Sequence, residues 1–192
     1  MKNKIQHIIQ ESVLLKQKLL ADKNTEETVE HLVVFLSQKL KKEQAVYLCG
    51  NGGSAADALH IAAEFSGRFY LNRKALPVEA LNVNMAAITA ISNDYGFENV
   101  FARMLEAKAT KGDVLWVFST SGQSKNIIKV AEKAKEMGVA VVSFTGQKES
   151  ILDSIADFSV KIPSEITPRI QECDLLLGHI ICELVEQKLF NE

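Results

Sequence analysis

Glycine and proline are absent from the first 49 residues of this 192-residue chain, although ten glycines and three prolines follow. Both residues interrupt helices, so their absence favours unbroken helical segments. Apolar residues recur there every three or four positions, as on the buried face of a helix. The pattern stops at Asp22-Lys-Asn-Thr, where Asn24 and Glu27 have the spacing of a capping pair. The segment predicts two amphipathic helices, which need further helices, including those of another subunit, to pack against.

The chain also lacks an excess of charge, paired cysteines and long apolar runs. Its formal net charge is −2, which is not typical of proteins that bind nucleic acids or anionic membranes. Cys49, Cys173 and Cys182 form no Cys-x-x-Cys pair, and buried free thiols are typical of a reducing compartment. No run reaches the length of a transmembrane helix, and the N-terminus has no signal-peptide core. We expect a cytoplasmic protein with no nucleic-acid partner and no membrane partner.

From residue 45 onwards, short apolar segments alternate with helical patterns. Apolar strands separated by helices indicate an α/β fold in which both faces of a parallel sheet are covered. We expect a three-layer α/β/α sandwich with a five-stranded parallel sheet and an N-terminal helical pair. One domain, 1–192, would contain the pair (1–44), used in oligomerisation, and an α/β core with a closing helix (45–192). The expected strands are Ala45–Cys49, Val78–Leu81, Val114–Phe118, Val139–Phe144 and Phe158–Ile162, and the expected helices between them are roughly 55–66, 85–91, 98–109 and 124–137.

A glycine-rich turn follows the first of these strands. Gly50, Gly52 and Gly53 permit positive φ angles and close approach of a ligand, and the helix that follows offers free N–H groups to an anion. His60 and Glu64 are four residues apart on that helix and share one face. The turn and the pair together predict chemistry on a phosphorylated small molecule.

Two other interpretations of the turn are open. Gly50–Ala55 fits the G-x-G-x-x-A pattern of dinucleotide-binding sites, but the acidic residue that should end the second strand is missing at Leu81-Asn82. Alternatively, the glycines serve only the tight turn of the fold.

Hydroxyl groups cluster after the third strand, in the sequence Ser119-Thr-Ser-Gly-Gln-Ser124. Hydroxyls at a helix N-terminus can surround a phosphate without a lysine, and no Gly-Lys-Ser/Thr of a Walker A loop is present. Such segments also cap helices. The density of hydroxyls favours a phosphate site.

The stretch Ser92-Asn-Asp-Tyr-Gly-Phe97 has two interpretations. Asn, Asp and Gly favour a turn. Asn93 and Asp94 could instead bind sugar hydroxyls, and the sequence does not decide between these.

The closing helix, which we expect to start after Pro168, is apolar over most of its circumference and is therefore expected to be buried. Gln171 and His179 lie on it, about 80° apart around the axis, and buried polar side chains need partners. Together with His60 and Glu64 they offer two acid/base groups, a metal site, or both. The spacing alone leaves these alternatives open.

Several motifs in combination resemble the sugar-isomerase (SIS) domain family, and most closely its phosphoheptose isomerase branch. The similarity runs nearly end to end. It implies a homotetramer with active sites where subunits meet. It also implies conversion of sedoheptulose 7-phosphate to D-glycero-D-manno-heptose 7-phosphate, the first step towards heptose for bacterial surface lipopolysaccharide. The motifs are CGNGGSAADALHIAAE, GRF at Gly67–Phe69, SNDYGF, FSTSGQS and TPRIQE followed by His179.

The resemblance also implies roles for particular residues. Glu64 and His179 match the catalytic acid/base pair. His60, Glu64, Gln171 and His179 match positions that hold zinc in some members, one ion per subunit. Pro168 and Ala55-Ala56 depart from patterns of the family, so no role is assigned there. The implied substrate-binding residues are Asn51, Gly52, Gly53, Glu64, Arg68, Asn93, Asp94, Ser119, Thr120, Ser121, Ser124 and Gln171.

The chemistry of these residues agrees with the implied reaction. Moving a carbonyl from C2 to C1 through an enediol(ate) takes a proton from C1 and delivers one to C2, which a carboxylate and an imidazole can do. Zinc could polarise the oxygens. Glu64, however, cannot bind zinc tightly and remain a free base, and Gln171 is an unusual zinc ligand.

A different class of function is the main alternative. A close SIS branch is not enzymatic and binds the bacterial replication initiator, with a similar glycine turn and hydroxyl loop. That branch replaces the residues that match Glu64 and His179, whereas both are present here. A sugar-phosphate sensor without turnover would leave the His/Glu pair unexplained. The isomerase is therefore the favoured prediction.

Overall fold

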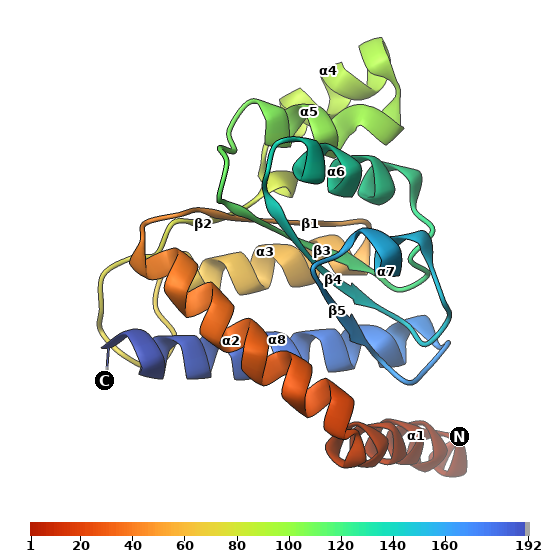
Figure 1. The fold of residues 1–192 in the computed structure, drawn as a ribbon. Coiled ribbons are helices and arrows are strands. Elements are labelled where there is room, and N and C mark those ends of the chain that lie inside the picture. Colours follow the sequence, from red (N-terminus) through yellow and green to blue (C-terminus); the bar gives the residue numbers. More distant parts are fainter. Residues whose placement is uncertain (191–192) are drawn as a thin grey trace.

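In the computed structural model, which describes residues 1–190, a five-stranded parallel sheet lies between two layers of helices (Figure 1). The strand order is β2-β1-β3-β4-β5, and Val46 pairs with Val78 on one side and Val114 on the other. This confirms the predicted three-layer α/β/α sandwich, and each predicted strand end lies within one residue of the observed one. The strands are β1 (Val46–Gly50), β2 (Val78–Ala80), β3 (Val114–Ser119), β4 (Ala140–Thr145) and β5 (Phe158–Lys161).

The two helical layers bury different faces of the sheet. One apolar cluster joins the sheet to the layer formed by α2, α3 and α8, to which α1 adds two residues. The other cluster joins the sheet to α4, α5, α6 and α7. The bounds are α1 (Lys2–Ala21), α2 (Lys23–Lys41), α3 (Gly53–Ser66), α4 (Met85–Tyr95), α5 (Val100–Glu106), α6 (Lys125–Glu136), α7 (Ile151–Ile155) and α8 (Thr167–Phe190), with 3₁₀ turns at η1 (Leu81–Val83) and η2 (Phe97–Asn99).

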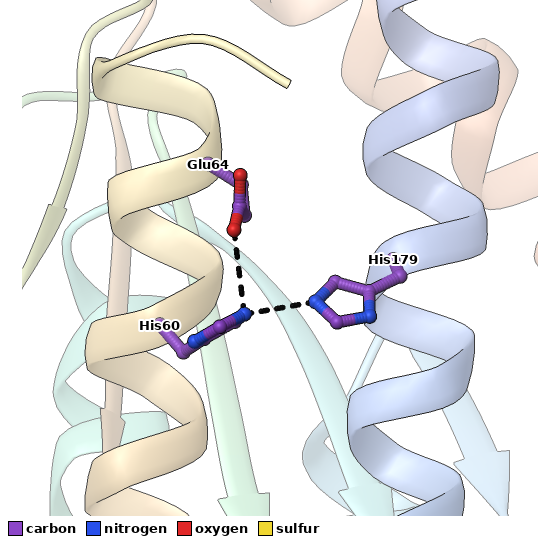
Figure 2. Close-up of side chains that lie close together, drawn as sticks. All are labelled: His60, Glu64 and His179. Carbon is purple, nitrogen blue, oxygen red and sulfur yellow. Dashed lines mark hydrogen bonds and ion pairs between the residues drawn. The ribbon is translucent and has the colours of Figure 1, made fainter. Parts of the chain in front are cut away.

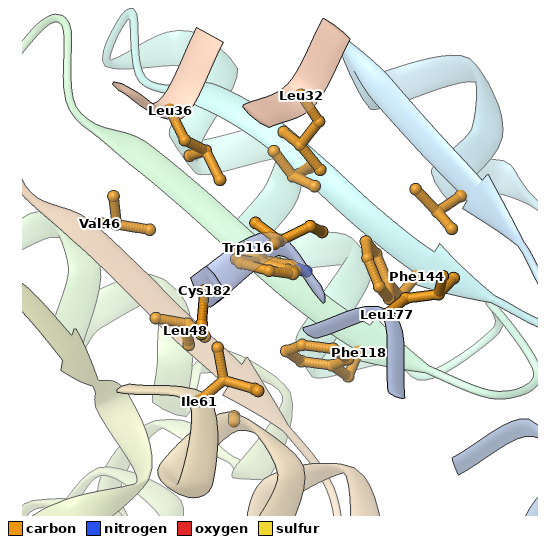
Figure 3. Packing of buried hydrophobic residues seen from close by; sticks show 14 of the residues in the cluster. Leu32, Leu36, Val46, Leu48, Ile61, Trp116, Phe118, Phe144, Leu177 and Cys182 are labelled. Carbon is orange, nitrogen blue, oxygen red and sulfur yellow. The ribbon is translucent and has the colours of Figure 1, made fainter. Parts of the chain in front are cut away.

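Aromatic side chains fill the centre of the first cluster (Figure 3). Trp116 and Phe118, on β3, stack with ring centroids 5.5 Å apart, and Phe144 of β4 packs against both. Leu177 of α8 and Leu32 of α2 close over this group. The packing therefore fixes α8 on the sheet, next to α3.

The N-terminal pair differs in detail from its prediction. Asp22, not Asn24, caps α2, because its side chain accepts a hydrogen bond from the Asn24 N–H at 3.1 Å and from the Thr25 hydroxyl at 2.7 Å. Helix α1 buries only Leu15 and Leu19 and extends away from the body (Figure 1). Its other apolar side chains are exposed in the single chain, as the prediction of an intersubunit role requires.

Three local predictions were wrong or incomplete. Ser92–Tyr95, which the sequence left open as a turn, forms the end of α4, and Gly96 with φ 86° follows it. The helix expected at 98–109 is shorter, since η2 precedes α5. Helix α7 was missed because it has only five residues; a capping box of Ser150 and Asp153 starts it.

Helix α8 begins at Thr167, one residue before Pro168, and is not buried all round. Leu176, Ile180 and Leu184 form a stripe that is 37–40% exposed in the single chain. The stripe lines an apolar groove of about 820 Å³ together with residues of α1 and α2, among them Leu20 and Val34. Among the described residues, no helix is both long and apolar enough to cross a membrane.

Candidate active site

Two loops meet where the order of the strands reverses. The chain goes from β1 to β2 on one side, and β3 pairs with β1 on the other, so the carboxyl ends of β1 and β3 form a topological switch point. Ligands of open α/β sheets bind at this place. The glycine turn follows β1, and the hydroxyl loop Ser119–Ser124 follows β3. The fold thus brings the two predicted phosphate-binding segments together.

Other groups lie very close to the glycine turn at two positions. A Cβ on Gly50 would lie 2.5 Å from the Ser54 carbonyl oxygen, and one on Gly53 would lie 2.7 Å from Oε1 of Gln171. Gly52, with φ 55°, is the N-cap of α3 and is exposed. The turn therefore presents its backbone at the start of a helix, with the Gln171 amide beside it.

Asparagines connect this turn to its surroundings. Asn51 and Asn126 exchange two side-chain hydrogen bonds of 2.9 and 2.8 Å, which tie the turn to the first turn of α6. Asn82 donates to the Gly50 carbonyl at 2.9 Å. The sequence interpretation missed Asn82 and Asn126. Asn126 could have been noticed, because it is a polar residue on the apolar face of α6 with Val130.

Backbone hydrogen bonds, one within the loop and one from Gly146 after β4, hold the hydroxyl loop. The Gly122 N–H donates to the Ser119 carbonyl, and the Thr120 carbonyl accepts from Gly146. Ser124 is the N-cap of α6, yet its side chain accepts no hydrogen bond from the first helical turn. As the N-cap residue, Ser124 lies at the positive end of the helix dipole, where an anion is favoured.

His60, Glu64 and His179 converge from two helices (Figure 2). His60 Nε2 lies 3.3 Å from Glu64 Oε1 on α3 and 2.9 Å from His179 Nε2 on α8. The three ligand atoms lie within 4.8 Å of one another, and His179 and Glu64 are half-buried. Helical spacing placed His60 beside Glu64, and the packing of α8 on α3 adds His179.

This donor set fits zinc. Imidazole nitrogens and a carboxylate oxygen are its usual ligands, and tetrahedral bonds of about 2.0–2.1 Å separate two ligand atoms by roughly 3.3 Å. The observed separations of 2.9 and 3.3 Å are close to that value. The described residues thus offer three ligand atoms to a metal ion, and a tetrahedral ion would have one position left.

Gln171, the fourth predicted ligand, lies on α8 two turns before His179, about 12 Å along the axis. Its amide lies beside Gly53, where an added Cβ would meet it. Arg68 is exposed on the loop that follows α3. Zinc binding by Gln171 and sugar binding by Arg68 stay predictions.

Asn93 and Asp94 are placed elsewhere. They lie at the end of α4, which packs in the opposite helical layer, and the Asn93 amide donates to Asp94 at 2.8 Å. Both are exposed. Within one chain they therefore do not join His60 and its neighbours.

Two carboxyl groups with raised pKa values, one half-buried and one buried, were not noticed in the sequence. Asp57 lies one turn before His60, and burial raises its pKa to about 6 despite the opposing charge of His60. Asp174 of α8 is fully buried, and neither of its oxygens has a partner among the described residues. Burial, with the negative charge of Asp57, raises the Asp174 pKa well above its usual range.

Comparisons with known proteins agree with this architecture. The family model described as "SIS domain" matches residues 11–146. The phosphoheptose isomerase of Clostridium acetobutylicum is 46% identical over 192 residues, which cover 100% of this chain and 98% of that protein. A phosphoheptose isomerase structure from Francisella tularensis has a TM-score of 0.92 at 29% identity, covering 96% of this chain and 97% of that one. The phosphoheptose isomerase structure from Neisseria gonorrhoeae has a TM-score of 0.90 at 35% identity, and the match covers 97% of this chain and 98% of that one.

Proposed function

This chain belongs to the SIS domain family and, within it, to the phosphoheptose isomerases, and from this premise we propose how its residues carry out the reaction. The reaction converts the ketose sedoheptulose 7-phosphate to the aldose D-glycero-D-manno-heptose 7-phosphate. One observation carries the assignment of residues: a carboxylate, Glu64, and an imidazole, His179, converge on His60 from two helices.

The phosphate would bind at the switch point. Ser119, Thr120, Ser121 and Ser124 offer hydroxyl groups, and the 51–53 turn offers its backbone at the start of α3. From Gly53 to His60 the helix rises by about 10 Å. That separation is comparable to an extended seven-carbon sugar, so a phosphate on C7 at the turn leaves C1 and C2 beside the His/Glu group.

Glu64 and His179 would move the protons. A proton leaves C1 and a proton arrives at C2 through an enediol(ate), and the carboxylate and the imidazole divide these transfers between them. His60 would keep Glu64 and His179 in fixed positions relative to each other, because its Nε2 contacts both side chains. In Figure 2 one Glu64 oxygen points towards His60, and the other points away from both imidazoles.

The same side chains would hold one zinc ion per subunit. His60, Glu64 and His179 are supported as ligands by their separations, and Gln171 is the proposed fourth. When bound, zinc supplies a Lewis acid for the carbonyl oxygen. Glu64 would act either as a ligand of the ion or as the base, because it cannot bind zinc tightly and remain a free base. Activity measured with and without the metal distinguishes these two roles.

Assembly would complete the site. Exposed apolar residues of α1 and the stripe on α8 support a homotetramer with active sites at subunit interfaces. Asn93 and Asp94, exposed on the opposite layer, would then reach a neighbouring subunit's site. Residues 1–192 would form one domain, since α2 of the 1–44 pair shares its apolar cluster with the 45–192 core. We place the enzyme in the cytoplasm, at the start of the heptose supply for lipopolysaccharide.

The non-enzymatic alternative, a protein that binds the replication initiator, is not favoured. The relatives at 43–46% identity over the full length are named phosphoheptose isomerase. Glu64 and His179, which a purely binding protein does not need, contact the same imidazole.

Incubation with sedoheptulose 7-phosphate in D₂O tests the proposal. NMR should detect the aldose with deuterium at C2, because an acid/base group exchanges its proton with solvent. Protein inactivated by heat is the control. If no aldose forms, the isomerase assignment fails; if the aldose forms without deuterium, the division of the two proton transfers between Glu64 and His179 fails.

A further inference from the structure

A buried ion pair connects the loop after α3 to the last turns of α8. Arg73 Nε lies 2.9 Å from Glu186 Oε1, and each side chain is only 3% exposed. The other ion pairs among the described residues each have at least one partner more than 20% exposed. Buried charges are costly unless they are fully hydrogen-bonded, so the contacts of this pair are informative.

Glu186 organises the loop backbone. Its carboxylate accepts hydrogen bonds from the N–H groups of Phe69, Tyr70 and Leu71 at 3.2, 2.8 and 2.9 Å. Burial alone would raise the Glu186 pKa, but these bonds and the one from Arg73 hold it below its usual range. The carboxylate is therefore charged and fixes three successive residues of the loop.

Arg73 organises the end of α3. Its Nη2 donates to the Glu64 carbonyl at 2.9 Å, and its Nη1 donates to the Phe65 carbonyl at 2.7 Å. These carbonyls belong to the last turn of α3, where the helix has no basic residue of its own. A cation stabilises the negative end of a helix and satisfies its free carbonyls. The guanidinium thus holds the turn that carries Glu64.

The pair also reaches His179. Glu186 follows His179 by seven residues, about two turns, on nearly the same side of α8. The Phe69 ring, whose N–H the carboxylate binds, lies 5.8 Å from the His179 ring, centroid to centroid. One ion pair therefore connects the helix of Glu64, the helix of His179 and the backbone of Phe69, whose ring lies beside His179.

We propose that Arg73 and Glu186 are positioning residues that set Glu64 and His179 at their working separation. This inference rests on the proposed isomerisation. Arg73 and Glu186 are each only 3% exposed and are not among the residues proposed to bind the substrate. The pair acts through the Glu64 carbonyl and through Phe69, while the phosphate loops lie at the other end of α3.

Glu186→Gln is the main test variant. The amide of the glutamine would place N–H groups opposite the N–H donors that now bind the carboxylate. It would also leave the positive charge of Arg73 without its buried counter-charge. The loop and the last turn of α3 should therefore shift. Displacement of a catalytic group by about 1 Å can cost roughly 100-fold in rate. We expect kcat to fall about 10- to 100-fold. The inhibition constant of inorganic phosphate should stay within about twofold, because such binding is independent of the reacting end.

Two further variants separate positioning from loss of stability. Asp113 is a matched control: it is buried just before β3 and accepts from the Ala45 and Thr110 N–H groups at 2.9 and 2.8 Å, and these residues belong to neither α3 nor α8. Asp113→Asn should lower the melting temperature and leave kcat within about twofold. Arg73→Lys keeps the charge but loses the fork of donors, so its kcat should lie between Glu186→Gln and wild type.

Imidazole NMR of ¹⁵N-histidine protein gives a readout that needs no turnover. The proposal predicts that Glu186→Gln shifts the His60 and His179 signals, whereas Asp113→Asn leaves them in place. Unshifted signals, or a kcat of Glu186→Gln equal to that of Asp113→Asn, overturn the proposal. If wild-type protein shows no turnover, the proposed function fails, and the imidazole spectra alone decide the positioning role.

Discussion

His60 Nε2 and His179 Nε2 lie 2.9 Å apart, although the two residues are 119 positions apart in the sequence. Two ring nitrogens at this separation share either one proton or one metal ion, because two donors or two acceptors would repel each other. The contact thus brings two histidines and Glu64 into a single unit.

Removal of one imidazole should weaken zinc binding. We expect His60→Ala to reduce zinc affinity by more than the roughly 10–100-fold that loss of an outer-shell partner costs, since His60 is a direct ligand in this account. Competition with a chelating dye measures the affinity. His31→Ala, at an exposed position on α2, is the control and should match wild type. If wild type, His60→Ala and His31→Ala bound zinc with equal affinity, His60 would not be a zinc ligand.

Gly53→Ala should impair substrate binding without lowering the stability of the fold. The new Cβ would meet the end of the Gln171 side chain, which can swing away at little cost, and alanine favours a helix by up to about 1 kcal/mol over glycine. We expect an unchanged or higher melting temperature but a raised KM, because Gln171 is displaced and the turn is closed to the phosphate. Gly52→Ala has free space but φ 55°, so it should lose about 1–2 kcal/mol. A normal KM for Gly53→Ala would contradict this account of the turn.

Stability should depend on pH through Asp174. Its folded pKa is raised above the unfolded value, so the folded state binds the proton more tightly and stability falls as the pH rises above the unfolded pKa near 4. Asp174→Asn removes this penalty. The variant should melt at a higher temperature than wild type at pH 8 and at a similar temperature at pH 4.

Calorimetry at the two pH values measures this difference. Asp157→Asn is a suitable comparison, because its carboxylate accepts from Lys135 at 2.6 Å and from the Val141 N–H at 2.8 Å, and its loss should destabilise. If Asp174→Asn also destabilised the protein at pH 8, Asp174 would have a cationic partner in the assembled protein.

Assembly should depend on the apolar stripe of α8. Leu184 is 40% exposed and lines the groove of about 820 Å³ between α8 and the N-terminal helices. A charge at this position should prevent another subunit from packing there, so Leu184→Glu should dissociate the tetramer into species of lower mass. Ile151→Glu, on α7 in the opposite layer, is the control. Light scattering measures the mass, and a monomeric wild-type protein at micromolar concentration would contradict the proposal.

The layers of the fold could be predicted because the sheet is buried on both faces. β1 and β3 are apolar at nearly every position, so their ends were found within one residue. The N-cap of α2 was harder to predict, because Asn24 offers a capping side chain as good as that of Asp22. Only the backbone of Asp22, with ψ 95°, decides between the two residues. The five-residue helix α7 gave too short a pattern to be recognised.

From residue spacing alone, the candidate site could be predicted only where its geometry is local; the resemblance to the SIS family added His179. The spacing of His60 and Glu64 on one helix places them together without further information. The contact of His60 with His179, and that of Arg73 with Glu186, depend on how α8 packs along α3, which no local pattern specifies. The exposed stripe of α8 was mistaken for buried surface because periodicity does not tell which neighbour covers a face.

The central claim is that Glu64 and His179 act in the chemical step, and the kcat of His179→Gln tests it most directly. Loss of a positioned acid or base costs about 10²–10⁴ in rate. We predict such a loss for His179→Gln and Glu64→Gln, with sedoheptulose 7-phosphate still bound in calorimetry and the melting temperature within a few degrees of wild type. Ser121→Ala, which alters phosphate binding, should instead raise KM more than it lowers kcat. A near-normal kcat for His179→Gln would mean that His179 is only structural, and the proposed mechanism would be wrong.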